Sequence, residues 1–242
     1  MKLRILGNPD RYLAPLSGGS SYLVTLGATR VLLDAGGGAR DALAAAGVTR
    51  LDAVVLSHFH QDHVLDLATL RDAMDAHTTL VIPRGERRRL DALADAFAFE
   101  GPFGLDGPIV EQEELAIGGM RLRFATTQHS APSMATRIDA GGESLVYASD
   151  TAPCDALRAL SRGCDLLLAH TLLPALPEGQ PHLKIHTTAE TAARLAKEVG
   201  ARKLVLSHRY HGSADADMLA HAPGATLAAP GATHAIRGSG RP

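Results

Sequence analysis

The stretch SHFHQDH at residues 57–63 places three histidines and one aspartate in seven positions. It follows AVVL at 53–56, an apolar run that is typical of a buried strand. A loop that leaves the end of a strand can bring these side chains to one point, whereas a helix would place residues i and i+2 on different faces. Imidazole nitrogens and a carboxylate oxygen suit Zn²⁺ or another first-row divalent ion. The stretch therefore predicts a metal site at the end of a strand.

Four side chains of ligand type exceed what one tetrahedral ion with an open position requires, so the crowding favours two ions. Two ions need further ligands, and three other apolar runs end on such a residue. These residues are His129 after MRLRFATTQ, Asp150 after SLVYAS and His208 after KLVLS. One histidine of this kind would more often be structural. All three together with the 57–63 stretch indicate a shared site at one rim of a β core.

Apolar runs separated by turn residues predict alternating strands and helices. In the first half, strands are expected at 3–7, 21–27, 29–36, 51–57 and 79–83, and helices at 40–47, 64–76 and 86–98. The middle is rich in strands, with a turn at Asp139–Gly142, and helices return before His208. This pattern fits two packed sheets with helices outside, a four-layer αββα arrangement, although periodicity alone also allows a doubly wound sheet. Without a long linker, we expect one domain over 1–242.

Composition restricts the setting and the partners of the protein. Apolar residues make up 45% of the chain and the formal net charge is −2, so no global positive field attracts nucleic acid. The basic run RGERRRL at 84–90 is expected to be a solvated helix face rather than an RNA-binding patch. The sequence shows no signal peptide and no 18-residue apolar run, which predicts a cytoplasmic protein that does not bind membranes. Cys154 and Cys164 are expected to be buried and reduced.

The motif HFHQDH matches the HxHxDH signature of the metallo-β-lactamase superfamily. ATTQHS, ASDT and LVLSH follow in the order of the later ligand motifs, so the chain resembles this superfamily over essentially residues 1–210. The resemblance implies an α/β fold with the four-layer αββα sandwich, and two divalent ions, zinc first with manganese or iron as alternatives. It implies this ligand set: His58, His60 and His129 for one ion, Asp62, His63 and His208 for the other, and Asp150 between them.

The segment IHTTAETAARLAKEVGARKLVLSH at 185–208 resembles the C-terminal motif of the ribonuclease Z-like branch. This resemblance makes His186 an additional catalytic group, while a histidine at a helix start is otherwise more often a capping or surface residue. Thr187 or Thr188 is expected to cap the helix that follows.

Two departures from ribonuclease Z bear on the substrate. That branch usually carries an acidic residue that supports the histidine at the position of His186, and Thr171 stands where a Glu is expected. GPFGLDG at 101–107 is also too short and not basic enough to clamp a tRNA precursor. Both features weigh against tRNA 3′ processing. The sequence therefore predicts a dinuclear metal-dependent hydrolase, a phosphodiesterase that acts on small phosphodiesters through a metal-bridging hydroxide.

Asp62 is expected to orient the attacking water and accept its proton, and His186 to donate a proton to the leaving oxygen or stabilise the charge on it. A lactonase, an arylsulfatase, a phosphotriesterase and a tRNA 3′-processing endonuclease remain alternatives, and an iron-dependent redox enzyme is less favoured. The expected partner is a small ester. Nucleic acid is not favoured, and a homodimer is considered because members of this branch often dimerise. Asp34 either fixes an imidazole tautomer or forms a turn before Gly36.

Overall fold

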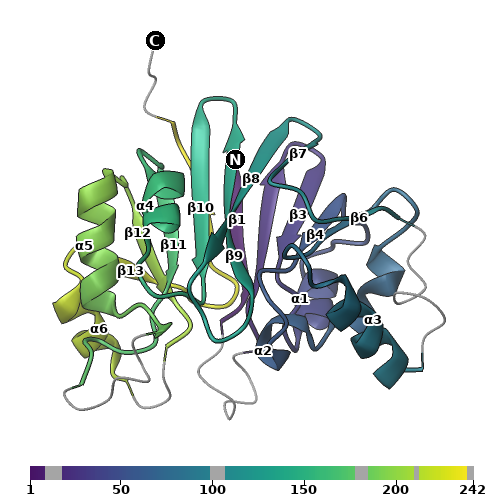
Figure 1. Ribbon diagram of the computed structural model, residues 1–242. Helices are drawn as coiled ribbons and strands as arrows, with labels where there is room; N and C mark the ends of the chain where they lie inside the picture. The colour runs from purple at the N-terminus through teal and green to yellow at the C-terminus, as the bar shows by residue number, and fades with distance from the viewer. Residues whose placement is uncertain (9–17, 99–106, 178–184, 210–212, 239–242) are drawn as a thin grey trace.

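The computed structural model describes residues 1–8, 18–98, 107–177, 185–209 and 213–238 (Figure 1). Within this part of the chain, strands form two seven-stranded sheets that face each other. The strands of the first sheet are β1 (Lys2–Gly7), β2 (Ser21–Leu26), β3 (Thr29–Leu33), β4 (Ala53–Val55), β5 (Thr79–Val81), β6 (Ile109–Val110) and β14 (Thr233–Ala235). They lie in the order β14–β1–β2–β3–β4–β5–β6.

The second sheet has the order β13–β12–β11–β10–β9–β8–β7. Its strands are β7 (Glu114–Ile117), β8 (Met120–Thr127), β9 (Ser133–Ala140), β10 (Glu143–Ser149), β11 (Leu166–His170), β12 (Leu204–Ser207) and β13 (Thr226–Leu227). In each sheet one half is antiparallel and the other half parallel, with β3 to β6 parallel in the first and β10 to β13 parallel in the second. The carboxyl ends of parallel strands meet at one edge of a sheet, and polar loops can converge there.

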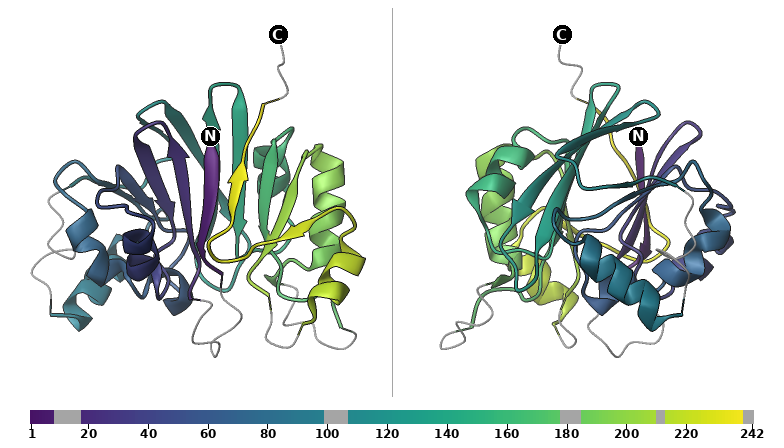
Figure 2. Two further views of the ribbon diagram at one scale, coloured as in Figure 1. Left: turned by 180° about the vertical axis from the view of Figure 1, so that it is seen from behind. Right: turned by 45° about the vertical axis from the view of Figure 1, so that its right-hand side comes forward.

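Helices cover the outer face of each sheet (Figures 1 and 2). The helices on the first sheet are α1 (Ala39–Ala45), α2 (Gln61–Val64), the 3₁₀ helix η1 (Leu67–Ala73) and α3 (Arg87–Ala96). Those on the second sheet are α4 (Asp155–Ser161), α5 (Ala189–Val199) and α6 (Asp215–His221). The layers therefore run helix, sheet, sheet, helix, which confirms the expected four-layer αββα sandwich.

Side chains alternate along the strands between the layer that separates the sheets and the layer under the helices. On β2, Tyr22 and Val24 pack between the sheets, while Leu23 packs toward the helices. On β11, Leu168 packs between the sheets and Leu167 packs under the helices of the second sheet. Because successive strand residues point to opposite faces, this alternation also sets where the residues that follow each strand point.

The helices expected at 40–47 and 86–98 are confirmed by α1 and α3. The helix expected at 64–76 is confirmed only in part, because this segment forms the last residue of α2 and then the shorter 3₁₀ helix η1 instead of one α-helix. The reason lies in tertiary hydrogen bonds to Ala35. Its N–H donates to the His63 carbonyl at 2.7 Å, and its carbonyl accepts from the Asp66 N–H at 2.9 Å. These bonds occupy backbone groups that a continuous α-helix would use.

Other expectations from the sequence are also tested by the structure. Cys154 and Cys164 are buried and free, as expected. The turn after β9 places Gly141 and Gly142 at φ 57° and 79°, which explains the paired glycines. No helix in the described ranges is long and apolar enough to cross a membrane. The loop at 101–107 lies, apart from Gly107, outside the described residues.

Candidate metal centre

The predicted site residues meet at the edge where the parallel strands end. His58 and His60 follow β4, and Asp62 and His63 lie in α2 directly after them. From the second sheet come His129 after β8, Asp150 after β10 and His208 after β12. His186 lies just before α5. The structure therefore brings together residues that are up to 150 positions apart in the chain.

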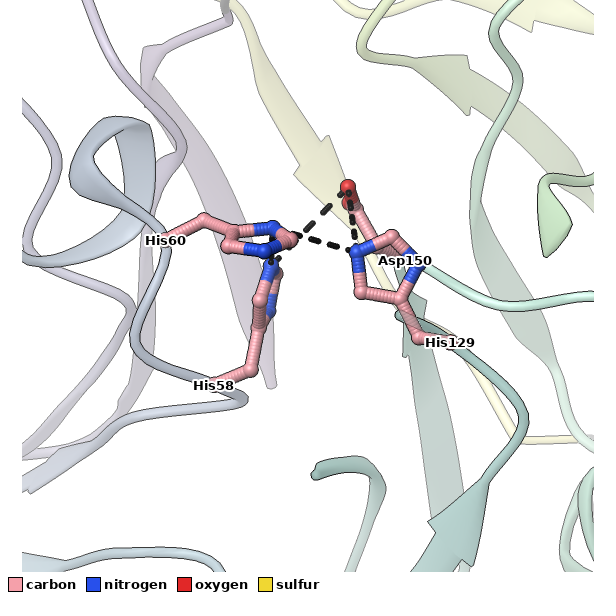
Figure 3. A group of neighbouring side chains, drawn as sticks. All are labelled: His58, His60, His129 and Asp150. Atoms are coloured by element: carbon pink, nitrogen blue, oxygen red, sulfur yellow. Dashed lines mark hydrogen bonds and ion pairs between the residues drawn. The ribbon is translucent and has the colours of Figure 1, made fainter. Parts of the chain in front are cut away.

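The first group consists of His58, His60, His129 and Asp150 (Figure 3). The Nδ1 atom of His60 lies 3.0 Å from Nε2 of His58 and 3.1 Å from Nε2 of His129. The Asp150 carboxylate lies 3.7 Å from the same nitrogen of His129. An ion bound tetrahedrally at a zinc–nitrogen distance separates its ligands by about 3.3 Å, so these nitrogens have the spacing of a metal site.

The second group consists of His63, Asp150, His170 and His208, all buried, with donor atoms within 4.8 Å of one another. Nε2 of His63 lies 3.4 Å from Oδ1 of Asp150. Asp62 borders this group, because its Oδ2 lies 2.7 Å from Nε2 of His208 and 3.5 Å from Nε2 of His63. Asp150 belongs to both groups, so one carboxylate joins two clusters of imidazoles.

The charges and the burial of these groups suit divalent cations. Burial alone would raise the pKa of Asp150, but His170, His208 and His63 hold it well below its usual range, so the carboxylate is charged. Burial lowers the pKa of His58 well below its usual value, so this imidazole is neutral and keeps a free lone pair. A buried carboxylate and buried imidazoles with available lone pairs are donors that first-row divalent ions prefer. The site therefore fits divalent metal binding.

Asp34 fixes the orientation of His63 from behind the site. Its fully buried carboxylate accepts hydrogen bonds from Nδ1 of His63 at 2.7 Å and from Tyr147 Oη at 2.6 Å. The N–H and the hydroxyl of Ser57 add bonds of 2.6 and 2.7 Å. With a proton on Nδ1 held by Asp34, Nε2 of His63 is the nitrogen that would face a cation bound in the second group. Of the two interpretations of Asp34, the structure supports the one that fixes a tautomer.

The backbone of Asp62 is held by two glycine-containing loops. Its carbonyl accepts a 2.8 Å hydrogen bond from the Ser20 N–H. A β-carbon at Gly36 would lie 2.2 Å from the same carbonyl oxygen, so the loop after β3 can approach Asp62 only with glycine there. Burial alone would raise the pKa of Asp62, but the hydrogen bond from His208 and the nearby His63 lower it, so this carboxylate is also charged.

His186 lies beside both groups without belonging to either. Its ring centroid is 5.1 Å from that of His129 and 5.6 Å from that of His170. Burial lowers its pKa to about 4. The helix that follows begins at Thr188, which forms a capping box with Thr191, as expected. The Thr187 hydroxyl donates a 2.7 Å hydrogen bond to the Thr151 carbonyl and so anchors the segment next to Asp150.

His170 is the site residue that sequence reasoning missed. The sequence placed Thr171 opposite His186, but the Thr171 hydroxyl donates to the Ser207 carbonyl at 3.1 Å, whereas His170 contacts the His186 ring. The cause is strand alternation: His170 is on the same face of β11 as Leu168, between the sheets. A signal was present, because LLLAH also ends an apolar strand on a histidine.

A cavity of about 210 Å³ lies beside β8 and the start of β9. Its walls include Arg84, Glu111, Thr126, Ser133 and Met134. The hydroxyl of the wall residue Ser133 donates a 3.4 Å hydrogen bond to the backbone carbonyl of Asp150, which makes Ser133 a neighbour of the site. The lining combines charged and polar residues with apolar ones such as Ile82, Phe124 and Met134, so the cavity suits a small group of mixed polarity.

Comparison with known proteins identifies similar sequences over most of the chain. Residues 29–209 match the family described as "Beta-lactamase superfamily domain". Ribonuclease Z of Mycobacterium bovis is 29% identical over 239 residues, which cover 86% of this chain and 85% of that protein. Ribonuclease Z of Mycobacterium sp. (strain KMS) is 30% identical over 220 residues, covering 78% of this chain and 77% of the relative.

Solved structures show the same fold. The metallo-beta-lactamase fold protein YhfI from Bacillus subtilis superposes with a TM-score of 0.84 at 24% identity, over 97% of this chain and 99% of that one. The short form of human tRNase Z superposes with a TM-score of 0.77 at 19% identity, over 98% of this chain and 100% of that one. A diphosphatase from the PhnP family gives 0.79 at 20% identity, over 98% of each chain. At these identities the likeness concerns the architecture of the chain.

Proposed function

Because the chain belongs to the metallo-β-lactamase superfamily and is a metal-dependent hydrolase, we propose that it hydrolyses small phosphodiesters with two divalent ions, zinc in first place. The observation that carries the proposal is the arrangement of two imidazole groups around the shared carboxylate of Asp150, with His186 beside both. Paired metal sites are typical of enzymes that displace groups at phosphorus, since two cations can hold both the attacking and the leaving oxygen.

Each ion has its own set of imidazoles in this proposal. His58, His60 and His129 hold the first ion, and His63 and His208 hold the second. Asp150, which belongs to both groups, would be shared by the two ions, and Asp62 would complete the second set because its Oδ2 lies next to both histidine nitrogens.

When bound, the two ions supply a water of lowered pKa, so that hydroxide is available near neutral pH. Asp62 is charged and fixed through its backbone, and it orients this water and accepts its proton. His186 lies beside both ligand groups and offers an N–H to the leaving oxygen. With a pKa of about 4, His186 is neutral near neutral pH and stabilises the charge on the leaving oxygen through this hydrogen bond, while Asp62 acts on the water.

The choice of a phosphodiester rests on the relatives. Ribonuclease Z proteins at 29–30% identity over most of the chain carry in their name an activity on RNA, whose backbone is a phosphodiester. The diphosphatase of similar fold also carries a phosphate substrate in its name. We propose that the cavity next to Ser133 receives a substituent of the ester.

The preference for a small ester over RNA rests on the charges near the site. Two of the four arginines of the basic run at 84–90 form ion pairs within the same helix region: Arg87 with Asp91 at 3.0 Å and Arg89 with Glu86 at 2.6 Å. Paired arginines attract a polyanion less than free ones. Cys154 and Cys164 are free and buried, which fits a reducing compartment, and we place the protein in the cytoplasm.

Cleavage of a tRNA precursor is a second candidate, because the ribonuclease Z relatives match nearly the whole length of the chain. It shares the same metal site and the same bond type. The two candidates differ in the size of the substrate, so they can be distinguished by direct comparison.

The test is a panel of substrates offered to metal-stripped protein reloaded with zinc, manganese or iron. We expect bis-p-nitrophenyl phosphate to be hydrolysed faster than an aryl sulfate, a lactone or a phosphotriester. Hydrolysis of another ester, with the phosphodiester untouched under every metal, would refute the substrate class. Faster cleavage of a tRNA precursor would favour the second candidate. The variant Asp150→Ala, which lacks the shared carboxylate, serves as the control for contaminating phosphatases.

A further inference from the structure

His170 is a buried imidazole for which the proposed function has no role. It ends β11 and is 1% exposed, and its Nδ1 faces Oδ1 of Asp150 in an ion-pair contact. Its ring stacks on that of His208 with centroids 3.5 Å apart and an angle of 30° between the planes. A histidine held in the interior against a carboxylate and a second imidazole requires a physical reason, because burial of polar groups is costly.

The position of its nitrogens indicates what His170 does. Nδ1 faces the same Asp150 oxygen that lies 3.4 Å from Nε2 of His63, so both nitrogens converge on one side of this carboxylate. The donor atoms of His63, Asp150, His170 and His208 all lie within 4.8 Å of one another. Nε2 of His170 is buried and has no hydrogen-bond partner among the described residues. Convergence of four buried donor atoms of ligand type on one point is typical of a cation site.

We propose that His170 is a ligand of the second ion, in addition to His63, His208, Asp62 and the shared Asp150. This inference rests on the two-ion site of the proposed function and deepens it. With His170, the second ion has three imidazoles, the same number as the first. Imidazole favours zinc, iron or nickel, whereas carboxylates favour manganese and magnesium. His170 therefore makes the second position a zinc-type site rather than a manganese-type one.

Zinc affinity is the first test, measured by competition with a chromophoric chelator on the full chain. Wild-type protein should bind two zinc ions per chain. The variant His170→Ala should keep the first ion and bind the second more weakly. Loss of a supporting residue lowers metal affinity by about 10–100-fold, and we expect the loss of a ligand to lower it further. Thr171→Val is the matched control, because it changes the neighbouring buried residue, whose hydroxyl faces Ser207, and should leave both affinities unchanged.

A second variant keeps the inference testable if removal of His170 impairs folding. His170→Glu restores a donor at the same position but exchanges nitrogen for oxygen. We expect it to bind a second ion and to shift the preference of that site from zinc toward manganese. Thermal unfolding of the metal-free variants shows whether each is folded.

A spectroscopic readout separates a ligand from a residue that only supports the site. In Co²⁺-loaded protein, a coordinated histidine gives a paramagnetically shifted N–H proton signal, and the buried Nε2–H of His170 is shielded from exchange with water. His170→Ala should remove one such signal. Unchanged zinc affinities together with an unchanged set of shifted signals would overturn the inference.

The metal readouts are independent of the substrate. If phosphodiesters are not hydrolysed but His170→Ala loses the second ion, the proposed function fails and the role of His170 stands. If phosphodiesters are hydrolysed and His170→Ala retains both ions at wild-type affinity, the role of His170 fails and the proposed function stands.

Discussion

The side-chain oxygen of Asn8 accepts a 2.7 Å hydrogen bond from the backbone N–H of His208, 200 positions later in the chain. The Asn8 nitrogen in turn donates to the Ala228 carbonyl at 2.8 Å. His208 has a φ of 53°, in the left-handed region that a β-carbon disfavours. Strain of this kind persists only where neighbours hold it, and here it directs the His208 imidazole toward Asp62 and Asp150.

Asn8→Ala should therefore lower the affinity for the second ion and leave the affinity for the first ion unchanged. The loss of a group that orients a ligand costs about 10–100-fold in metal affinity, and zinc titration against a chelator measures it. Asn8→Asp keeps an acceptor for the His208 N–H and should retain most of the affinity. If Asn8→Ala lowered the affinity for both ions equally, the substitution would have caused a general loss of structure instead.

Removal of Asp34 should destabilise the protein strongly. Asp34→Ala leaves Ser57, His63 and Tyr147 without their buried acceptor, and loss of one partner of a buried charged network costs about 3–5 kcal/mol. Tyr147→Phe removes one donor and should cost less, about 1.5–3 kcal/mol, the range for a hydrogen bond to a charged group. Urea unfolding of the metal-free variants measures both. Equal stability of Asp34→Ala and wild type would contradict the network.

Acidification should destabilise the metal-free protein. Burial holds the pKa of His58 and of His170 well below the usual 6.5, so both are neutral when folded and take up protons on unfolding below that pH. Each of the two histidines lowers the free energy of unfolding by up to about 1.4 kcal/mol per pH unit as the pH falls below 6.5.

His63 does not reverse this trend. Burial alone would lower its pKa, but Asp150 and Asp34 raise it well above 6.5, so its contribution is fully present below pH 6.5 and is lost only at higher pH. Urea unfolding between about pH 6.5 and pH 5, where the contribution of His63 is constant, tests the sign. His58→Gln, with one titrating group fewer, should show a shallower slope. A free energy of unfolding that rises on acidification would show that His58 and His170 are charged in the folded protein.

His186→Ala should lower turnover by about 10²–10⁴-fold, the usual contribution of a general acid, while both metal ions are retained. The loss should be larger for a phenyl than for a p-nitrophenyl leaving group, because the poorer leaving group depends more on a donated proton. Steady-state rates with both esters, together with elemental analysis, measure this. A parallel loss of metal and turnover, independent of the leaving group, would make His186 a structural residue.

Much of the site could be predicted because its ligands are locally marked. HFHQDH follows a buried strand, and His129, Asp150 and His208 each end or follow an apolar run. The layered fold followed from the count and order of strands and from the motifs. These signals are local in the chain, and strand ends at one edge then bring the residues together.

The contributions of Asn8, Asp34 and His170 depend on long-range packing. No local pattern indicates that Asn8 meets His208, because the contact is made only when the first sheet approaches the second. His170 was missed because the resemblance directed attention to Thr171, one residue beyond, and only the alternation on β11 shows which of the two faces the site. The 3₁₀ helix η1 likewise results from tertiary hydrogen bonds to Ala35.

The central claim is that two ions at the shared Asp150 site catalyse phosphodiester hydrolysis. The most direct measurement is the rate of bis-p-nitrophenyl phosphate hydrolysis as zinc is added in steps to metal-stripped protein. We predict that the rate rises mainly with the second equivalent per chain and is constant beyond it. Full activity at one equivalent, or no hydrolysis at any metal content, would contradict the claim.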